Sequence, residues 1–489
     1  MKSAAIGGVL TLATCIVSGC GDDEDPLSGL GGGVGAYGAY GGAGANGGYG
    51  GYGGYGGYGG GSYAVGPVGQ SGQGGGGGYG AEGSTANLPT PIAPPPDPTD
   101  CEGLDPSQPL VLYVSADDSN SMASPARARE ALDLGAQSYL GAIRTYEFFN
   151  YYRFDYPAPA AGTAALFAEA LPGSEPGSID LQFAVRAKDP PPVRRPMTLT
   201  FVLDTSGSMA GEGVLRERAA VVALASKLQD GDIVNAVTWS ASQEVLLSNH
   251  AVAGPNDPVL LELAQDLDAN GGTDLNAGLV KGYDLAIESY DPDRLNRLVL
   301  ISDGGANVGI TNKELIAEHS ELNDEEGIYL VGINTGGGAG DELMDVVTDE
   351  GRGAYVYLDK PSEAQNILAN RFDEVMEVAA RGVQLQLTVP WYFQMKKFYG
   401  EQYSEDASEV KPQHLAPGDT MVLLQTLKAC DTSLLVGTDP ITIVASWNTP
   451  ILHQAESLTL VTSVDELLLA PAPHRTCQRA RRLPRTQTR

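Results

Sequence analysis

Between residues 197 and 378 the sequence alternates β-branched apolar runs with stretches whose apolar residues recur at helical spacing. The apolar runs predict strands at residues 198–203, 232–239, 243–247, 297–302, 327–334 and 354–358. The helical spacing predicts helices at residues 214–228, 258–267, 275–289, 312–323, 341–349 and 362–378. Strands that alternate with helices in this way predict an α/β fold with a doubly wound, mostly parallel sheet. Because such sheets bind ligands beyond the carboxyl ends of their strands, we expect functional side chains there.

Three segments that end or follow predicted strands carry side chains with oxygen atoms. The first segment, residues 201–209, contains Asp204, Ser206 and Ser208 in a D-x-S-x-S pattern. The second, Gly-Gly-Thr-Asp-Leu, supplies Thr273, and the third, Leu-Ile-Ser-Asp-Gly, supplies Asp303. Carboxylate and hydroxyl oxygens suit a hard cation, so we expect Mg²⁺, with Mn²⁺ or Ca²⁺ as alternatives.

The alternate positions of the D-x-S-x-S pattern let three side chains point into one concave loop, and Gly207 permits its tight backbone path. Two carboxylates leave the ion short of charge neutrality and one position open to water. The carboxylate of an Asp or Glu on a partner protein can replace that water. The three segments together resemble the metal-ion-dependent adhesion site of von Willebrand factor type A domains. The resemblance implies this fold, a cation held by the five side chains, and binding instead of catalysis.

A second D-x-S-x-S pattern, formed by Asp117, Ser119 and Ser121, follows an apolar run at residues 110–114. No Gly-Gly-Thr segment and no strand that ends in Asp-Gly follows it before Met197. Too few residues intervene for a complete domain of this kind. We therefore interpret the second pattern as a coincidental or vestigial match that holds no metal.

The regions on both sides of the α/β segment have the alternation of apolar and polar residues that is typical of strands. The predicted strands lie at residues 179–188, 383–389, 420–427 and 441–447. We expect residues 109–196 and 381–470 to fold together into a β-sandwich, with the α/β domain of residues 197–380 inserted between them. The aromatic-rich residues 146–157 resemble the flank of a bacterial envelope family of type A proteins.

The first hundred residues predict a targeting signal followed by a flexible tether. Lys2 precedes an apolar run at residues 4–17, and a helix of that length spans only about 21 Å, which is too short for a bilayer. Residues 1–19 therefore predict a signal peptide. The run ends in Val-Ser-Gly-Cys, which resembles a bacterial lipobox and implies lipid attachment to the Cys20 thiol. An ordinary secretory signal is the alternative.

Residues 20–108 are rich in glycine with interspersed tyrosine and then rich in proline, so no core can form and we expect a disordered tether. Residues 471–489 form a basic tail. In an oxidising compartment one disulfide is expected among Cys101, Cys430 and Cys477. The sequence leaves its pairing open.

Charge and composition limit the function. The chain has 61 acidic residues against 30 Lys and Arg, a net charge of −31, so it repels phosphate backbones and we expect no nucleic-acid partner. We find no nucleophile with a base, no paired general acid and base and no cofactor motif, and we expect no enzymatic activity.

We therefore expect a cation-dependent binding or adhesion module that captures a carboxylate of a partner protein. It would be lipid-anchored in the bacterial cell envelope, at the outer membrane or the cell surface. The alternative is a structural or accessory subunit of an envelope complex, in which the metal only stabilises the fold.

Overall fold

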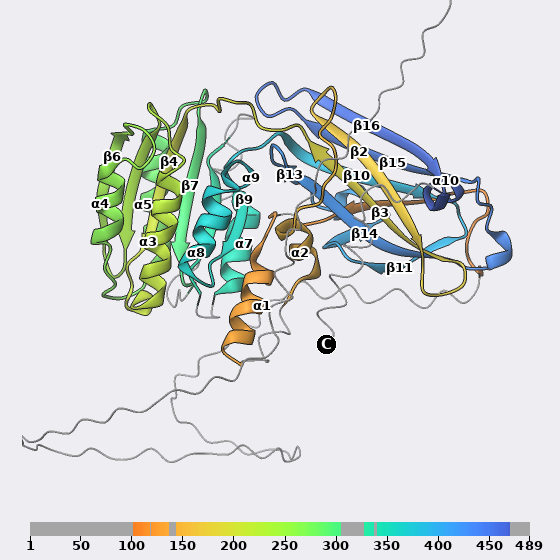
Figure 1. Cartoon of the computed structure of the whole chain (residues 1–489), viewed down its shortest axis with the longest axis horizontal. Coiled ribbons are helices and arrows are strands. Elements are labelled where there is room, and N and C mark those ends of the chain that lie inside the picture. Colours follow the sequence, from red (N-terminus) through yellow and green to blue (C-terminus); the bar gives the residue numbers. More distant parts are fainter. Residues whose placement is uncertain (1–100, 118, 136–142, 305–326, 337–339, 470–489) are drawn as a thin grey trace, which may run out of the picture. The chain divides into compact units, whose positions relative to one another are not determined.

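The computed structural model describes residues 101–469, except residue 118 and residues 136–142, 305–326 and 337–339. One part is a six-stranded sheet in the order β6-β5-β4-β7-β8-β9 (Figure 1). Strand pairing is parallel throughout, except that β6 runs antiparallel to β5 at one edge. The strands are β4 (Met197–Asp204), β5 (Ile233–Trp239), β6 (Gln243–Ala251), β7 (Leu295–Ser302), β8 (Tyr329–Asn334) and β9 (Arg352–Tyr357).

Helices cover both faces of this sheet because its central strands are apolar on both sides. Every residue of β4 is buried. Leu199 and Phe201 pack into the same core cluster as residues of α3 and α4, whereas Val202 packs with residues of α5 and α7 on the other face. The helices are α1 (Ala123–Asp133), α3 (Glu212–Ala225), α4 (Pro258–Asp266), α5 (Leu275–Glu288) and α7 (Asp341–Gly351). The predicted α/β fold with a doubly wound, mostly parallel sheet is confirmed.

Strands from both sides of the α/β domain pair with one another and form two further sheets. One sheet has the order β12-β1-β10-β15-β16, with β13 also paired to β10, and the other has the order β11-β14-β3-β2. The strands are β1 (Leu110–Ser115), β2 (Ala164–Pro172), β3 (Ser178–Ala187), β10 (Ala380–Val389), β11 (Phe393–Phe398), β12 (Gln402–Ser404), β13 (Gln413–Leu415), β14 (Thr420–Ala429), β15 (Pro440–Asn448) and β16 (Ala455–Ser463).

The two sheets share one apolar core, so they form a sandwich. In one sheet, Leu112 of β1 is the cross-strand neighbour of Leu387 of β10. In the other sheet, Phe183 of β3 is the cross-strand neighbour of Leu423 of β14. All four side chains belong to the same buried cluster. The expectation of a β-sandwich that is interrupted by the α/β domain is therefore confirmed.

A disulfide joins Cys101 to Cys430, across 329 residues of sequence. Cys101 and Leu104 pack against the core of the sandwich. The sequence predicted a tether as far as residue 108, but the chain is bound to the sandwich from Cys101 onward. The composition of residues 102–108 hid this boundary, because the disulfide and the core contacts of Cys101 and Leu104 leave no periodic apolar pattern in the sequence.

Replacing both Cys101 and Cys430 by serine is expected to lower the free energy of unfolding by about 2–4 kcal/mol, because the cross-link constrains a long loop of the unfolded chain. Urea denaturation of the variant and of the wild type measures the loss. Adding a reductant to the wild type should reproduce it and should leave the variant unchanged. Equal midpoints for both proteins without reductant would contradict the prediction.

The helix predicted at residues 362–378 is interrupted in the structure. It is divided into α8 (Pro361–Ala364), a π-helical turn (Gln365–Ala369) and α9 (Phe372–Met376). The side chain of Arg371 donates to the carbonyls of Tyr151, at 2.8 Å, and Asn150, at 2.9 Å. These carbonyls belong to α2 (Thr145–Tyr151). A tertiary contact thus interrupts a stretch that is helical by local propensity.

Several sequence predictions lie outside the described residues. They are the signal peptide with Cys20, nearly all of the tether, the helix at residues 312–323, Cys477 and the basic tail. A last short helix, α10 (Val464–Leu469), ends the described chain. Within the described ranges, no helix is both long and apolar enough to cross a membrane.

Candidate functional site

The D-x-S-x-S loop leaves the carboxyl end of β4 in the middle of the α/β sheet. Asp204 is the last residue of this strand and is fully buried. The backbone N–H of Ser206 donates to Asp204 Oδ1 at 2.9 Å, and Ser206 Oγ lies 3.0 Å from Ser208 Oγ. Ser206 is buried and Ser208 is exposed, so the three side chains form a cluster that reaches from the core to solvent.

Backbone hydrogen bonds hold the second predicted loop against the first. Gly207 N–H donates to the carbonyl of Gly271 at 3.2 Å, and Asn270 N–H donates to the carbonyl of Thr205 at 2.8 Å. Thr273 is half-buried in this second loop. Among the described residues no hydrogen bond joins its hydroxyl to the first loop. The structure therefore places the loop of Thr273 against the D-x-S-x-S loop that follows Asp204. Only backbone groups make this contact among the described residues, and the Thr273 side chain takes no part in it.

The third predicted segment reaches Asp204 through a side chain that sequence reasoning missed. Ser302 is the last residue of β7, and its hydroxyl donates to Asp204 Oδ2 at 2.6 Å. The parallel pairing of β4 with β7 sets Leu203 opposite Ile301, so the next residues, Asp204 and Ser302, are brought together. The serine stood in the quoted segment, and only the strand pairing shows its role.

Asp303 lies close enough to Asp204 for the two carboxylates to interact. Burial raises the pKa of Asp204 to about 6, and the charge of Asp303 adds to that rise. Hydrogen bonds from Ser206 and Ser302 act in the opposite direction, because they favour the charged form. Two acidic groups that repel each other in a buried site favour the binding of a cation.

Glu217 is a third carboxyl group at this site, and sequence reasoning missed it as well. It lies on α3, is fully buried, and accepts the backbone N–H of Asp204 at 3.0 Å. Its other oxygen, Oε2, has no hydrogen-bond partner in the described part of the chain. Burial raises the pKa of Glu217 well above its ordinary value, and the charge of Asp204 adds to the rise. The helical spacing from Val214 to Val221 places Glu217 on the buried face, which was the available signal.

The donor set fits a hard cation. The carboxylate of Asp204 accepts hydrogen bonds from Ser206 and Ser302, both of which are neutral donors. A buried, orphaned oxygen of Glu217 lies beside the same strand end. A divalent cation would supply the positive charge that these groups lack, and the five predicted residues offer only oxygen ligands to it.

Replacing Glu217 by glutamine is expected to stabilise the chelated protein more at pH 8 than at pH 5. A carboxyl group whose folded-state pKa is raised contributes stability below its unfolded pKa of about 4.3 and loses it as the pH rises through the folded value. Glutamine keeps a carbonyl oxygen for the Asp204 N–H and has no such loss. Urea denaturation in EDTA at the two pH values measures the difference. The exposed Glu212→Gln is the control, and an equal gain from Glu217→Gln at both pH values would contradict the prediction.

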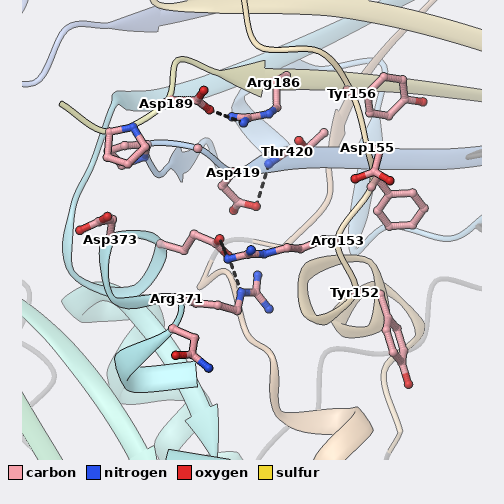
Figure 2. Close-up of a pocket in the computed structure, with 16 residues that line it drawn as sticks. Tyr152, Arg153, Asp155, Tyr156, Arg186, Asp189, Arg371, Asp373, Asp419 and Thr420 are labelled. Carbon is pink, nitrogen blue, oxygen red and sulfur yellow. Dashed lines mark hydrogen bonds and ion pairs between the residues drawn. The ribbon is translucent and has the colours of Figure 1, made fainter. Parts of the chain in front are cut away.

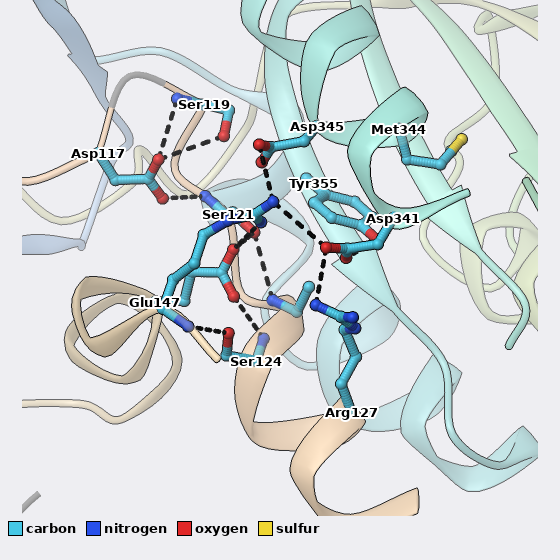
Figure 3. Close-up of polar contacts among 12 residues, drawn as sticks. Asp117, Ser119, Ser121, Ser124, Arg127, Glu147, Asp341, Met344, Asp345 and Tyr355 are labelled. Atoms are coloured by element: carbon cyan, nitrogen blue, oxygen red, sulfur yellow. Dashed lines mark hydrogen bonds and ion pairs between the residues drawn. The ribbon is translucent and has the colours of Figure 1, made fainter. Parts of the chain in front are cut away.

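The second D-x-S-x-S pattern belongs to a different kind of site (Figure 3). The carboxylate of Asp117 accepts hydrogen bonds from Ser119 Oγ at 3.3 Å, Ser121 N–H at 2.6 Å and Asn150 Nδ2 at 2.8 Å. The hydroxyl of Ser121 donates to Glu147 at 2.7 Å. Unlike the Asp204 site, this cluster contains a cationic donor, because Arg144 pairs with Glu147 at 2.7 Å. A positive charge is therefore already present, which favours the interpretation of a coincidental match.

Glu147 is the centre of this second cluster. It is fully buried and accepts Ser124 N–H at 2.6 Å and Arg144 Nη1 at 2.7 Å. Arg144 also pairs with Asp341, the first residue of α7, and Arg127 pairs with the same carboxylate at 2.7 Å. The pattern that resembled a metal loop is therefore part of a buried polar network that joins the segment after β1 to the α/β domain.

A cavity of about 400 Å³ lies among the loop after α2, the ends of β3 and β14, and α9 (Figure 2). Its arginines are paired with acids: Arg186 with Asp189, and both Arg153 and Arg371 with Glu374. Three further acids, Asp155, Asp373 and Asp419, also line the cavity, and we assign it no function.

Comparisons with known proteins agree with this fold. Residues 198–370 match the family model of the von Willebrand factor type A domain. The chain is 28% identical over 54% of its length to the uncharacterized protein YfbK of Escherichia coli, and 26% identical over 44% of its length to the uncharacterized protein sll0103 of Synechocystis. The matches cover 48% and 50% of those proteins, so the chain spans about half the length of the curated relatives it matches.

A solved von Willebrand factor type A structure from Catenulispora acidiphila is 13% identical to the chain, with a TM-score of 0.41. The match covers 64% of this chain and 76% of that one.

The family model spans the sheet from β4 to β9, including both Asp204 and Asp303. The chain therefore contains a von Willebrand factor type A domain at residues 198–370.

Proposed function

We propose that this domain binds a divalent cation, with Mg²⁺ foremost, and uses it to capture an Asp or Glu carboxylate of a partner protein. The ligands are Asp204, Ser206, Ser208, Thr273 and Asp303. The cation would supply a positive charge and one exchangeable position, while the protein residues hold it at the carboxyl edge of the sheet. The protein would act as a binding module without enzymatic activity, attached through Cys20 to the bacterial envelope.

One observation carries the proposal: three separate loops that bear only oxygen ligands are joined at one strand end. Ser206 and Ser302 donate to opposite oxygens of Asp204, and Gly207 joins the first loop to that of Thr273. Domains of this family are in general protein-interaction or adhesion modules. Among the described residues, the printed hydrogen-bond donors to Asp204 and Glu217 are neutral, and buried carboxylates with neutral donors cost stability unless an ion is bound.

The alternative is that the metal stabilises the fold of an accessory subunit and takes no part in binding. Two measurements on the full chain separate the two functions. Calorimetric titration with MgCl₂ tests for the ion. Capture of solubilised envelope proteins on the immobilised chain, in Mg²⁺ and in EDTA, then tests for the partner. Metal binding with equal capture in both buffers would favour the accessory subunit, and absence of metal binding would rule out both.

A further inference from the structure

A groove of about 520 Å³ lies beside the proposed metal loop, between β6 and α4. Thr205, which separates Asp204 from Ser206, is one of its lining residues. The N–H of Thr205 donates to the carbonyl of Trp239 at 2.9 Å, and its carbonyl accepts Asn270 N–H at 2.8 Å. Both contacts hold this part of the groove in place. Because Thr205 belongs to both the metal loop and the lining, a ligand bound at the metal loop would lie next to the groove.

The lining of the groove is apolar at its base and acidic at its rim. Leu247, Leu263 and Leu267 are buried or half-buried, while Leu246 and Val259 are 37% and 38% exposed. The acidic residues are Glu244, Glu262, Asp266 and Asp268, and all four are exposed.

No Lys, Arg or His side chain lines the groove among the described residues; Arg218, outside the lining, donates to the carbonyl of Leu267 at 3.2 Å. None of the four carboxylates makes an ion pair with another described residue, and the carboxylate of Asp268 accepts a hydrogen bond from Ala269 N–H. The groove is thus different from the cavity of Figure 2, whose arginines are all paired with acids.

We propose that this groove binds an extended segment of the partner protein that carries Lys or Arg and an apolar residue beside the metal-bound acid. The proposal rests on the proposed function, because the metal would hold the neighbouring carboxylate. Opposite charge at the rim favours basic side chains, and the leucines favour an apolar one between them. The stretch of β6 from Gln243 to Leu247 is about 16 Å long, so about five extended residues would fit along it.

Two other occupants fit the groove less well or compete with the partner. A second copy of the chain carries a net charge of −31, so an acidic groove would repel most of its surface. The chain's own basic tail, residues 471–489, has the positive charge that the acidic rim would attract. A peptide of this tail is therefore included in the test as a competitor.

The test is a selection of displayed random peptides of about a dozen residues on the immobilised full chain in Mg²⁺. We expect the selected peptides to carry Lys or Arg within about five positions of an Asp or Glu, which is the reach of the groove. Their affinity, measured by fluorescence anisotropy, should fall about tenfold or more in the double variant Glu262→Lys/Asp266→Lys. A selection without binders, or without basic residues among them, would overturn the proposal.

The matched control is Asp284→Lys/Glu288→Lys on α5. It has the same spacing and charge change, lies on the opposite face of the sheet, and should shift the affinity less than about twofold. An equal loss of peptide affinity in both double variants would mean a general charge effect and would overturn the proposal that the groove binds the segment. Thermal melts of both variants verify that they fold.

Failure of the groove and failure of the metal function give different results. Peptides that EDTA releases but that bind both double variants equally would overturn the groove and leave metal capture intact. Peptides that survive EDTA but are lost in Glu262→Lys/Asp266→Lys would support the groove and overturn metal capture. If a synthetic peptide of residues 471–489 displaces the selected peptides at similar concentration, the groove belongs to the tail and the proposed partner segment is overturned.

Discussion

Replacing Asp204 by alanine is expected to abolish both the stabilisation of this protein by Mg²⁺ and its binding of a partner carboxylate. At a Mg²⁺ concentration a hundredfold above the dissociation constant, the wild type should gain about 2.7 kcal/mol of unfolding free energy. The variant should gain none, because it lacks the buried carboxylate that Ser206 and Ser302 both contact. Partner affinity should fall at least about a hundredfold. Urea denaturation with Mg²⁺ and with EDTA measures the first effect, and binding of the selected peptides measures the second.

The control for this variant is Asp293→Asn, which changes an exposed acid in the loop before β7. It should keep the full response to Mg²⁺. The chelated Asp204→Ala protein should still unfold cooperatively, because alanine removes a buried acid whose charged form is disfavoured. A variant that retained the Mg²⁺ response would show that the cation binds elsewhere, and the proposed site would have to be abandoned.

Replacing Glu147 by alanine is expected to lower the free energy of unfolding by about 3–5 kcal/mol, because it leaves a buried network without its central acid. Arg144 loses a partner at 2.7 Å, and the donors of Ser121 and Ser124 are left unpaired in a buried site. The loss should be equal in Mg²⁺ and in EDTA. Chemical denaturation in both buffers measures it.

Glu212→Ala, at the exposed start of α3, is the matched control and should change the unfolding free energy by less than about 1 kcal/mol. The comparison also tests the second D-x-S-x-S pattern. A loss that appeared only in Mg²⁺ would mean that Asp117, Ser119 and Ser121 do hold a cation. A loss no larger than that of the control would mean that the network contributes little to stability.

The fold was predictable from the sequence where short-range periodicity reports it. Period-two and helical patterns located most of the described strands and helices of the type A domain within a few residues, because burial on one or two faces dictates which positions are apolar. The pattern around residues 362–378 failed, since the side chain of Arg371 reaches α2 and interrupts the helix. A contact with a distant segment leaves no trace in local periodicity.

At the candidate site, too, the sequence revealed the residues that lie close together in the chain and missed those that only the fold brings together. The oxygen-bearing residues Asp204, Ser206 and Ser208 stand close together in the chain and were visible as a motif. Ser302 and Glu217 were missed because they reach Asp204 only through the pairing of β7 with β4 and the packing of α3 on the sheet. The hydrogen bond from Ser121 to Glu147 could not be inferred either, because 26 residues separate the two in the sequence.

The sequence by itself determined the class of fold, the order of the elements, and the chemical type of the side chains at the edge of the sheet. Those properties depend on burial and on residue identity, and each can be read along a short stretch of chain. Only the tertiary structure decided that β1 pairs with β10, that Cys101 bonds Cys430, and that acids of β6 and α4 line one groove. These contacts join segments that are far apart in the sequence, and their geometry depends on how the layers pack.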